Sequence, residues 1–287
     1  MDTALPSLAP SALVPRLGRA DAPLLLDVRR AQAFAASDRL LPAAQHCPPE
    51  SVAAFARGQA PRSAVVYCAY GHHLSQDATR TLLASGWDAR VLEGGIEGGE
   101  AGVDRLEDIA HWRERPLPCI RKRPDLGVTG ERPSRWVTRA RPKIDRIACP
   151  WLVRRFIDAR AQFFYVPAEE VFAEAERLQA VPFDIPGAPI THEWERCSFD
   201  ALLRAFELQV PGLEALAAIV RGADTSRMDV APACAGLLAI SLGLSRLHAD
   251  DAAMLAAGLP VYDALFAWCR EGQAETHGWQ VHAGATQ

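Results

Sequence analysis

The residue best placed for chemistry is Cys68, which ends an apolar run and stands just before a helical pattern. In an open α/β sheet, ligands bind beyond the carboxyl ends of the strands, and this cysteine is expected there. A short loop at that point directs backbone N–H groups, and the positive end of the following helix, towards the sulfur. Both effects favour a reactive thiolate and would also stabilise an anionic persulfide. The loop consists of Ala69, Tyr70, Gly71, His72, His73 and Leu74.

The alternative for Cys68 is a buried thiol in an inactive module. The chain has seven cysteines and no C-x-x-C pair, so neither a disulfide framework nor a zinc ribbon is expected. The remaining lone thiols have no chemical neighbours in the sequence, and we expect packing or linker roles for Cys47, Cys119, Cys234 and Cys269.

A second group of reactive side chains lies in the segment 182–200. His192, Glu195 and Cys197 fall within six residues of one another, and imidazole, carboxylate and thiolate are all metal ligands. The irregular, Pro- and Gly-containing backbone would let them converge, together with Asp145, on a metal ion of unknown identity. The alternative is structural: Cys197 packs beneath the next helix and His192 bonds a backbone carbonyl.

Further polar residues of the second half could extend this site. Asp224 and Asp229 could supply carboxylates, although helix capping explains them equally well. The basic side chains of Arg139, Lys143 and Arg146 could together bind a small oxyanion, since guanidinium groups match tetrahedral anions. A solvated basic face that pairs with acids elsewhere is the alternative.

The elements that position Cys68 follow an alternating pattern. Short apolar runs separated by helical segments indicate a parallel sheet flanked by helices, which is an α/β domain. The strands are predicted at 24–28, 64–68 and 87–92, and the helices at 30–36, 50–57 and 75–86.

The second half is mainly helical with a little sheet, hence α+β. Its strands are predicted at 135–139 and 162–167, and its helices at 147–158, 169–179, 198–208, 212–222, 232–246 and 251–270. The resulting division is a first domain at 1–112, a basic Pro-rich linker at 113–133, a second domain at 134–271 and a flexible tail at 272–287. Because the linker shows no periodicity, we expect the halves to fold independently when separated near residue 125.

Composition narrows the function classes. The chain has 287 residues, 49% of them hydrophobic, with a net charge of −4, ordinary values for a globular protein. No apolar run approaches a membrane span and the N-terminus resembles no secretory signal, so we expect a cytoplasmic protein without membrane contact.

Residues 111–146 carry 11 Lys and Arg against 4 Asp and Glu. They lack an aromatic–basic signature and a recognition helix, so no nucleic-acid partner is expected.

The first half resembles the rhodanese (sulfurtransferase) family. The resemblance rests on LLLDVR at 24–29, VVYCAYG at 65–71 and VLEGGIEGG at 91–99, and it covers about residues 10–112. It implies transfer of sulfane sulfur through a persulfide on Cys68, with residues 69–74 as the cradle. It also implies support from Asp27 and Arg29, a sulfane donor, a thiol or other acceptor, and no required cofactor. Many members carry a basic residue, Ser or Thr where this chain has His72 and His73.

The second half resembles the C-terminal domain of the ChrB chromate-resistance family. The match includes RWVTRARPKIDRIACPWLVRRFID, PFDIPGAPITH, CSFDALL and IVRGADT, and it runs from about 134 to 271. A Gly is common in the family where this chain has Trp194. The resemblance implies chromate or another oxyanion as a ligand. The alternative is a chromate-responsive regulator with an inactive rhodanese module, but regulators of this family have a different N-terminal region. We therefore expect a sulfurtransferase coupled to an oxyanion-resistance domain.

Overall fold

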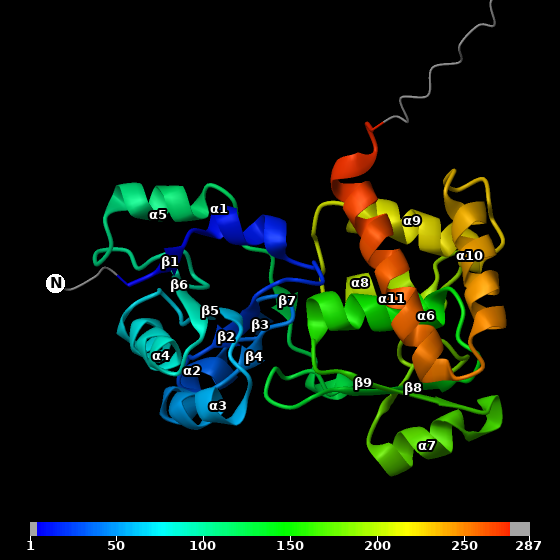
Figure 1. Cartoon of the computed structure of the whole chain (residues 1–287), viewed down its shortest axis with the longest axis horizontal. Coiled ribbons are helices and arrows are strands. Elements are labelled where there is room, and N and C mark those ends of the chain that lie inside the picture. The colour runs from blue at the N-terminus through cyan, green and yellow to red at the C-terminus, as the bar shows by residue number, and fades with distance from the viewer. Residues whose placement is uncertain (1–4, 276–287) are drawn as a thin grey trace, which may run out of the picture.

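The computed structural model describes residues 5–275 and contains the two predicted parts. Figure 1 shows the α/β part beside the mainly helical part. The first part contains a sheet of five parallel strands in the order β1-β6-β5-β2-β4. Its strands are β1 (Ser7–Leu8), β2 (Leu24–Asp27), β4 (Gln45–His46), β5 (Ser63–Tyr67) and β6 (Asp88–Leu92).

Helices cover both faces of this sheet, which confirms the α/β class. On β2, Leu24 and Leu26 share a core cluster with Ala78 and Leu82 of α4, because alternate residues of a strand face the same side. Leu25 belongs to the cluster on the opposite face. The helices are α1 (Pro10–Leu13), α2 (Ala31–Ala36), α3 (Val52–Gly58), α4 (His73–Ala84) and α5 (Leu106–Arg113).

The second part is mainly helical, as predicted, and its strands form a small parallel sheet of order β10-β8-β9. A π-helical turn, Val153–Ile157, extends α6 and buries Phe156. The strands are β8 (Arg135–Arg139), β9 (Gln162–Val166) and β10 (Val181–Pro182). The helices are α6 (Asp145–Leu152), α7 (Val171–Leu178), α8 (Ser198–Ala205), α9 (Leu213–Asp224), α10 (Cys234–Leu247) and α11 (Asp251–Ala267).

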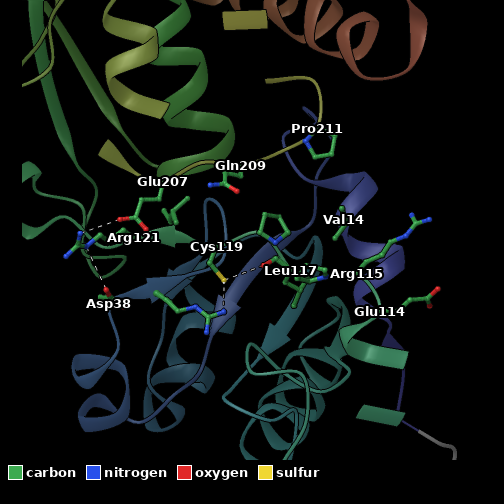
Figure 2. A pocket seen from close by; sticks show the side chains of 14 residues that line it. Val14, Asp38, Glu114, Arg115, Leu117, Cys119, Arg121, Glu207, Gln209 and Pro211 are labelled. Carbon is green, nitrogen blue, oxygen red and sulfur yellow. Dashed lines mark hydrogen bonds and ion pairs between the residues drawn. The ribbon is translucent and has the colours of Figure 1, made fainter. Parts of the chain in front are cut away.

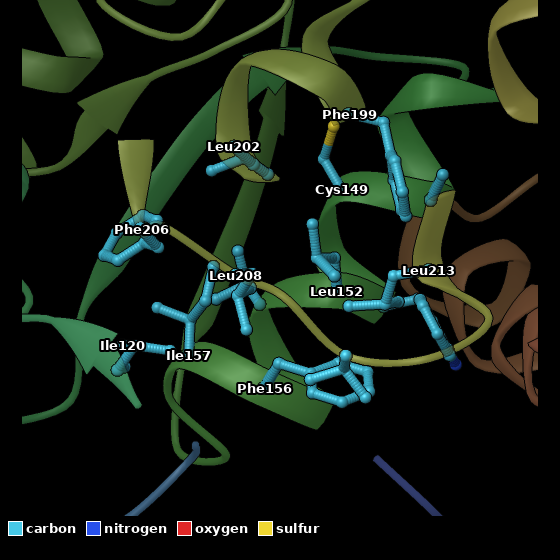
Figure 3. Close-up of a cluster of buried hydrophobic side chains, with 14 of the residues drawn as sticks. Ile120, Cys149, Leu152, Phe156, Ile157, Phe199, Leu202, Phe206, Leu208 and Leu213 are labelled. Carbon is cyan, nitrogen blue, oxygen red and sulfur yellow. The ribbon is translucent and has the colours of Figure 1, made fainter. Parts of the chain in front are cut away.

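The segment 113–133 is not the extended linker that its composition predicts. Its β7 (Ile120–Arg121) pairs antiparallel with β3 (Arg39–Leu40) of the first part. The side chain of Ile120 is buried, and Figure 3 shows it beside Phe206 and Leu208 of the second part. Periodicity cannot reveal burial in an irregular segment, because each apolar residue there packs on its own.

The two parts share one core, so the expectation of independent folding is wrong. A single cluster of buried side chains contains Leu13 and Tyr67 of the first part and Trp151 and Phe156 of the second. The backbone N–H of Ala43 donates to the carbonyl of Phe156 at 2.9 Å. The limits of the two domains along the chain remain a prediction.

Helix α11, with the turn that follows it, is apolar and long enough to meet a simple criterion for a membrane-spanning helix. The helical stretch Asp251–Gly272 is long enough to cross a membrane, contrary to the expectation that no such segment exists. Its Asp263 accepts hydrogen bonds from Trp151 and Arg155, both at 2.8 Å, which ties the helix to the core. Core helices of globular proteins meet the same test. Most of the predicted tail lies outside the described residues.

Candidate functional site

Cys68 lies directly after β5, between the strand and α4, as predicted. Its side chain is only 5% exposed, and its Sγ lies 3.4 Å from the hydroxyl of Ser75 in the first turn of α4. Ser75 in turn donates to the carbonyl of His72 at 3.0 Å. The thiol therefore sits over the helix N-terminus, at the base of the loop that follows it.

Backbone hydrogen bonds from the glycine turn after β6 fix the position of the loop. The N–H of Ile96 donates to the carbonyl of Cys68 at 3.1 Å, and that of Glu97 to the carbonyl of Ala69 at 2.9 Å. Gly71 has φ +80°, and a Cβ there would lie 2.8 Å from the carbonyl oxygen of Leu92. Only glycine satisfies both restrictions at this point.

The loop leaves backbone donors for an anion. Within residues 5–275, the N–H groups of residues 69–72 donate to no protein acceptor. Buried or half-buried N–H groups are rarely left without a partner, so these four donors are available to a bound anion. Free N–H groups in this loop are what the predicted cradle for a persulfide or an anionic sulfur donor requires, and that role stays a prediction.

Asp27 and Arg29, for which the sequence predicts a supporting role, lie at the end of β2 and just after it. Both side chains are buried, and the Arg29 Nη2 lies 2.6 Å from the Asp27 carboxylate. Burial opposes the charge on Arg29, but the hydrogen bonds and charge of Asp27 raise the pKa of Arg29 above its usual value. The same guanidinium donates to the carbonyl of Arg39 at 2.9 Å and so joins β2 to β3.

The two histidines of the loop differ in their surroundings. The Nε2 of His72 lies 3.1 Å from the carboxylate of Asp104, and its Nδ1 lies 3.5 Å from that of Glu100. Both ring nitrogens face acids, so the ring of His72 braces the loop against the segment before α5. His73 is exposed at the first position of α4.

A small cavity opens above Cys68. It has a volume of about 250 Å³, and its lining includes Cys68, Tyr70, His73 and Arg30. Arg30 is exposed, and within residues 5–275 it forms no ion pair, unlike the neighbouring Arg29. A small anion entering this cavity would meet one unpaired guanidinium at the rim.

Cys119 is the other thiol near a cavity. It lies in the pocket of about 730 Å³ between the two parts that Figure 2 shows, with Leu117 and Gln209 in its lining. Burial raises the pKa of Cys119 despite the hydrogen bond from Arg39, 3.4 Å from its Sγ. Burial likewise raises the pKa of Cys47 to about 11, as expected for a packing residue.

In the second part, the structure brings three carboxylates around one imidazole. The Nε2 of His192 lies 3.0 Å from Asp224, 3.4 Å from Asp184 and 3.5 Å from Asp145. Asp145 begins α6, Asp224 ends α9, and Asp184 follows β10. Three elements far apart in the sequence therefore direct one carboxylate each at the same point.

The environment of this cluster shifts the charges of its members. Burial, together with Asp224 and Asp184, raises the pKa of Asp145 to about 7. Hydrogen bonds to Asp145, Asp184 and Asp224 raise the pKa of His192 to about 12. Burial would also raise the pKa of Asp184, but hydrogen bonds from His192 and Ser198 lower it below its usual range.

The predicted metal site therefore needs correction. Glu195 points away from the cluster to Arg227, 3.0 Å distant, with its side chain 83% exposed. Cys197 is buried at the start of α8, and its Sγ lies 3.4 Å from the carboxylate of Asp200. This is the alternative in which Cys197 packs at the helix and does not bind metal. Asp184 carried no sequence signal, because only the folded chain places it beside His192.

The basic residues of this half are engaged in the fold. Arg139 and Arg146 lie 3.2 and 3.3 Å from Asp184, and Arg146 also donates to backbone carbonyls. Lys143 is half-buried and lines a separate surface depression. The three side chains do not converge on a shared anion site, so oxyanion binding by this set remains a sequence prediction without geometric support. Asp229 is exposed.

The fold and the cysteine loop define a rhodanese-like domain, and comparison with family models agrees. Residues 10–101 match the model described as the rhodanese-like domain. Residues 136–269 match the model described as the C-terminal domain of ChrB. The chain thus joins a rhodanese-like domain to a ChrB C-terminal domain.

Individual relatives overlap with parts of the chain. Protein ChrB of Cupriavidus metallidurans is 37% identical over 151 residues, which are 49% of this chain and 45% of that protein. This chain therefore spans less than half of that relative's length. A rhodanese homologue from Thermus thermophilus is 33% identical over 32% of this chain and 96% of its own, with a TM-score of 0.27. An As-Sb reductase from Leishmania major is 18% identical over 42% of this chain and 87% of its own, with a TM-score of 0.29.

Proposed function

We propose that the rhodanese-like domain is an active sulfurtransferase whose nucleophile is Cys68. The observation that carries the proposal is the thiol at the end of β5, beside the first turn of α4 and followed by a loop with four N–H groups that no described residue accepts. A cysteine with only a packing role would not require a loop whose conformation depends on Gly71 and on hydrogen bonds from the turn after β6.

The chemistry takes two steps. The Cys68 thiolate attacks the outer sulfur of an anionic sulfane donor such as thiosulfate. A new S–S bond forms, and the old S–S bond breaks with its electron pair leaving on sulfite. An acceptor, cyanide in the assay or a thiolate in general, then attacks the outer sulfur of the persulfide. The Cys68 thiolate leaves, which restores the starting state without any cofactor.

The N–H groups of the loop act at the moment when negative charge collects on sulfur. They stabilise the persulfide and the developing thiolate with fixed dipoles that need no reorganisation. Arg30 at the rim would attract the donor, whereas His72 holds the loop rather than the substrate. The buried pair of Asp27 and Arg29 keeps the end of β2 in place beneath the site.

The test is thiosulfate–cyanide sulfurtransfer by the full chain. Cys68→Ser removes the thiolate and should abolish turnover, whereas Cys119→Ser, the matched control at the other cavity, should leave it unchanged. Mass spectrometry after incubation with donor alone should show one added sulfur atom in the wild type and in Cys119→Ser. Turnover in Cys68→Ser, or a wild type that never gains sulfur, would show that the module is inactive or uses another thiol.

We further propose that the ChrB-type half links this activity to chromate or other oxyanion stress. The support is the match over residues 136–269 and the 37% identity to Protein ChrB. Deleting the gene and restoring it with wild type or with Cys68→Ser would test the link. Chromate tolerance should return with the wild type and fall short with the serine variant; equal restoration by both would separate sulfur transfer from resistance.

A further inference from the structure

The cluster of Asp145, Asp184, Asp224 and His192 has an excess of negative charge inside the second part. Arg139 and Arg146 neutralise Asp184 from one side. Within residues 5–275, Asp145 and Asp224 pair with no cation other than His192.

One buried oxygen of the cluster has no partner among the described residues. The side chain of Asp145 is only 1% exposed, and its Oδ2 accepts the N–H of Ser198 at 2.5 Å. Its Oδ1 is buried and accepts no hydrogen bond from residues 5–275. An unpaired carboxylate oxygen in the interior is costly, so the site favours a cationic ligand that this oxygen could contact.

The arrangement of the donors suits a single ion. Ligand atoms of Asp145, Asp184 and His192 all lie within 4.8 Å of one another. Opposite ligands of an ion with bonds near 2.1 Å are separated by about 4.2 Å, so a small contraction would bring them into contact with one ion. Ser198 donates from its hydroxyl to Asp184 at 2.9 Å, which orients that carboxylate as an outer-shell partner orients a ligand.

From this geometry we propose that Asp145, Asp184, Asp224 and His192 bind one divalent cation of the Mn²⁺ or Fe²⁺ type. Carboxylate oxygens suit hard ions, and a single imidazole shifts the preference towards the first transition row. The lack of a thiolate among these four ligands argues against a structural zinc site, since Cys197 is engaged with Asp200. The half-exposed His192 marks the solvent side, where water would complete the coordination sphere.

The backbone around the cluster is consistent with a functional role. Ile144, just before Asp145, has φ +33°, and Asp184 itself has φ +53°. Positive φ is strained for a β-branched residue and uncommon for others. Such strain persists where the surrounding fold imposes it, and it concentrates at ligand sites.

The experiment is a Mn²⁺ titration of the full chain after removal of metal with a chelator, using protein without a histidine tag. Electron paramagnetic resonance of the free aqua ion reports the bound fraction. The wild type should bind one ion per chain, and its melting temperature should rise with Mn²⁺. His192→Ala and Asp224→Asn should weaken binding at least tenfold. Glu195→Gln is the matched control, because this nearby acid points away from the cluster, and it should bind as the wild type does.

Two results would overturn the proposal. One is no saturable binding by the wild type, which would make the cluster a hydrogen-bonded structural network. The other is equal binding by wild type and His192→Ala, or equal loss in Glu195→Gln, which would place the ion elsewhere. Circular dichroism of each variant without metal shows whether it folds. If His192→Ala does not fold, the binding measured for Asp224→Asn decides the question instead. The outcome is independent of sulfur transfer, which Cys68→Ser tests in the other half.

Discussion

Replacing Gly18 with alanine should uncouple the two halves of the protein. Gly18 lies in the first part with φ +77°, against the ring of Phe156 in the second part. A Cβ at this position would overlap the ring itself, so either the ring or the backbone of the first part must move. The substitution thus adds one carbon atom where the first part packs directly against the ring of Phe156.

The magnitude follows from two separate effects. The left-handed backbone costs alanine about 1–2 kcal/mol relative to glycine. Overpacking a filled core costs about 1–3 kcal/mol more. Together these reduce the free energy of unfolding by about 2–5 kcal/mol, which corresponds to a fall in melting temperature of roughly 4–20 °C.

Gly102→Ala is the control that separates these effects. Gly102 has φ +82°, but a Cβ added there would have no atom within 4 Å, so alanine meets only the backbone penalty. Calorimetry of both variants should show a larger loss for Gly18→Ala, together with a broader or split transition. If both variants lose the same stability and unfold in one sharp transition, the contact with Phe156 does not couple the halves.

Two further predictions concern the buried charges of Asp27 and Lys122. Asp27→Asn leaves the buried Arg29 without its partner and should cost about 3–5 kcal/mol in a denaturant titration, while Asp21→Asn at an exposed pair should change little. Burial, helped by Arg29, lowers the pKa of Lys122 to about 8. Between about pH 8 and 10.5 the unfolded chain holds a proton on Lys122 that the folded chain has released, so this residue makes stability rise with pH. Lys122→Met should flatten that slope relative to the wild type, and an unchanged slope would contradict the assignment.

The position of Cys68 between a strand and a helix was predictable from the sequence because the signals there are local. A buried strand, a glycine and a helical pattern follow one another within about twenty residues, and the structure places Cys68 between β5 and α4. The sequence could not predict that the ring of His72 faces Asp104, since that acid is thirty-two residues away. In the second half, β8, β9 and the helices were also predictable from their apolar patterns, whereas the two-residue β10 was too short to give such a pattern.

The acidic cluster shows where sequence reasoning stops. Proximity in the chain suggested Glu195 and Cys197 as partners of His192, but a turn directs the first outwards and the start of α8 buries the second. Asp224 was recognised only as one of two options, and Asp184 was missed. A site assembled from the ends of separate elements has no spacing rule, so only the tertiary fold can reveal it.

The connecting segment links the two sites physically. Arg29, just after β2, donates to the carbonyl of Arg39 in β3, and β3 pairs with β7. The N–H of Arg121 in β7 then donates to the carbonyl of Phe206, at the end of α8. The first residue of α8 is Ser198, which bonds both Asp145 and Asp184. A short series of backbone and side-chain contacts thus runs from Arg29, just after β2, to the acidic cluster in the second part.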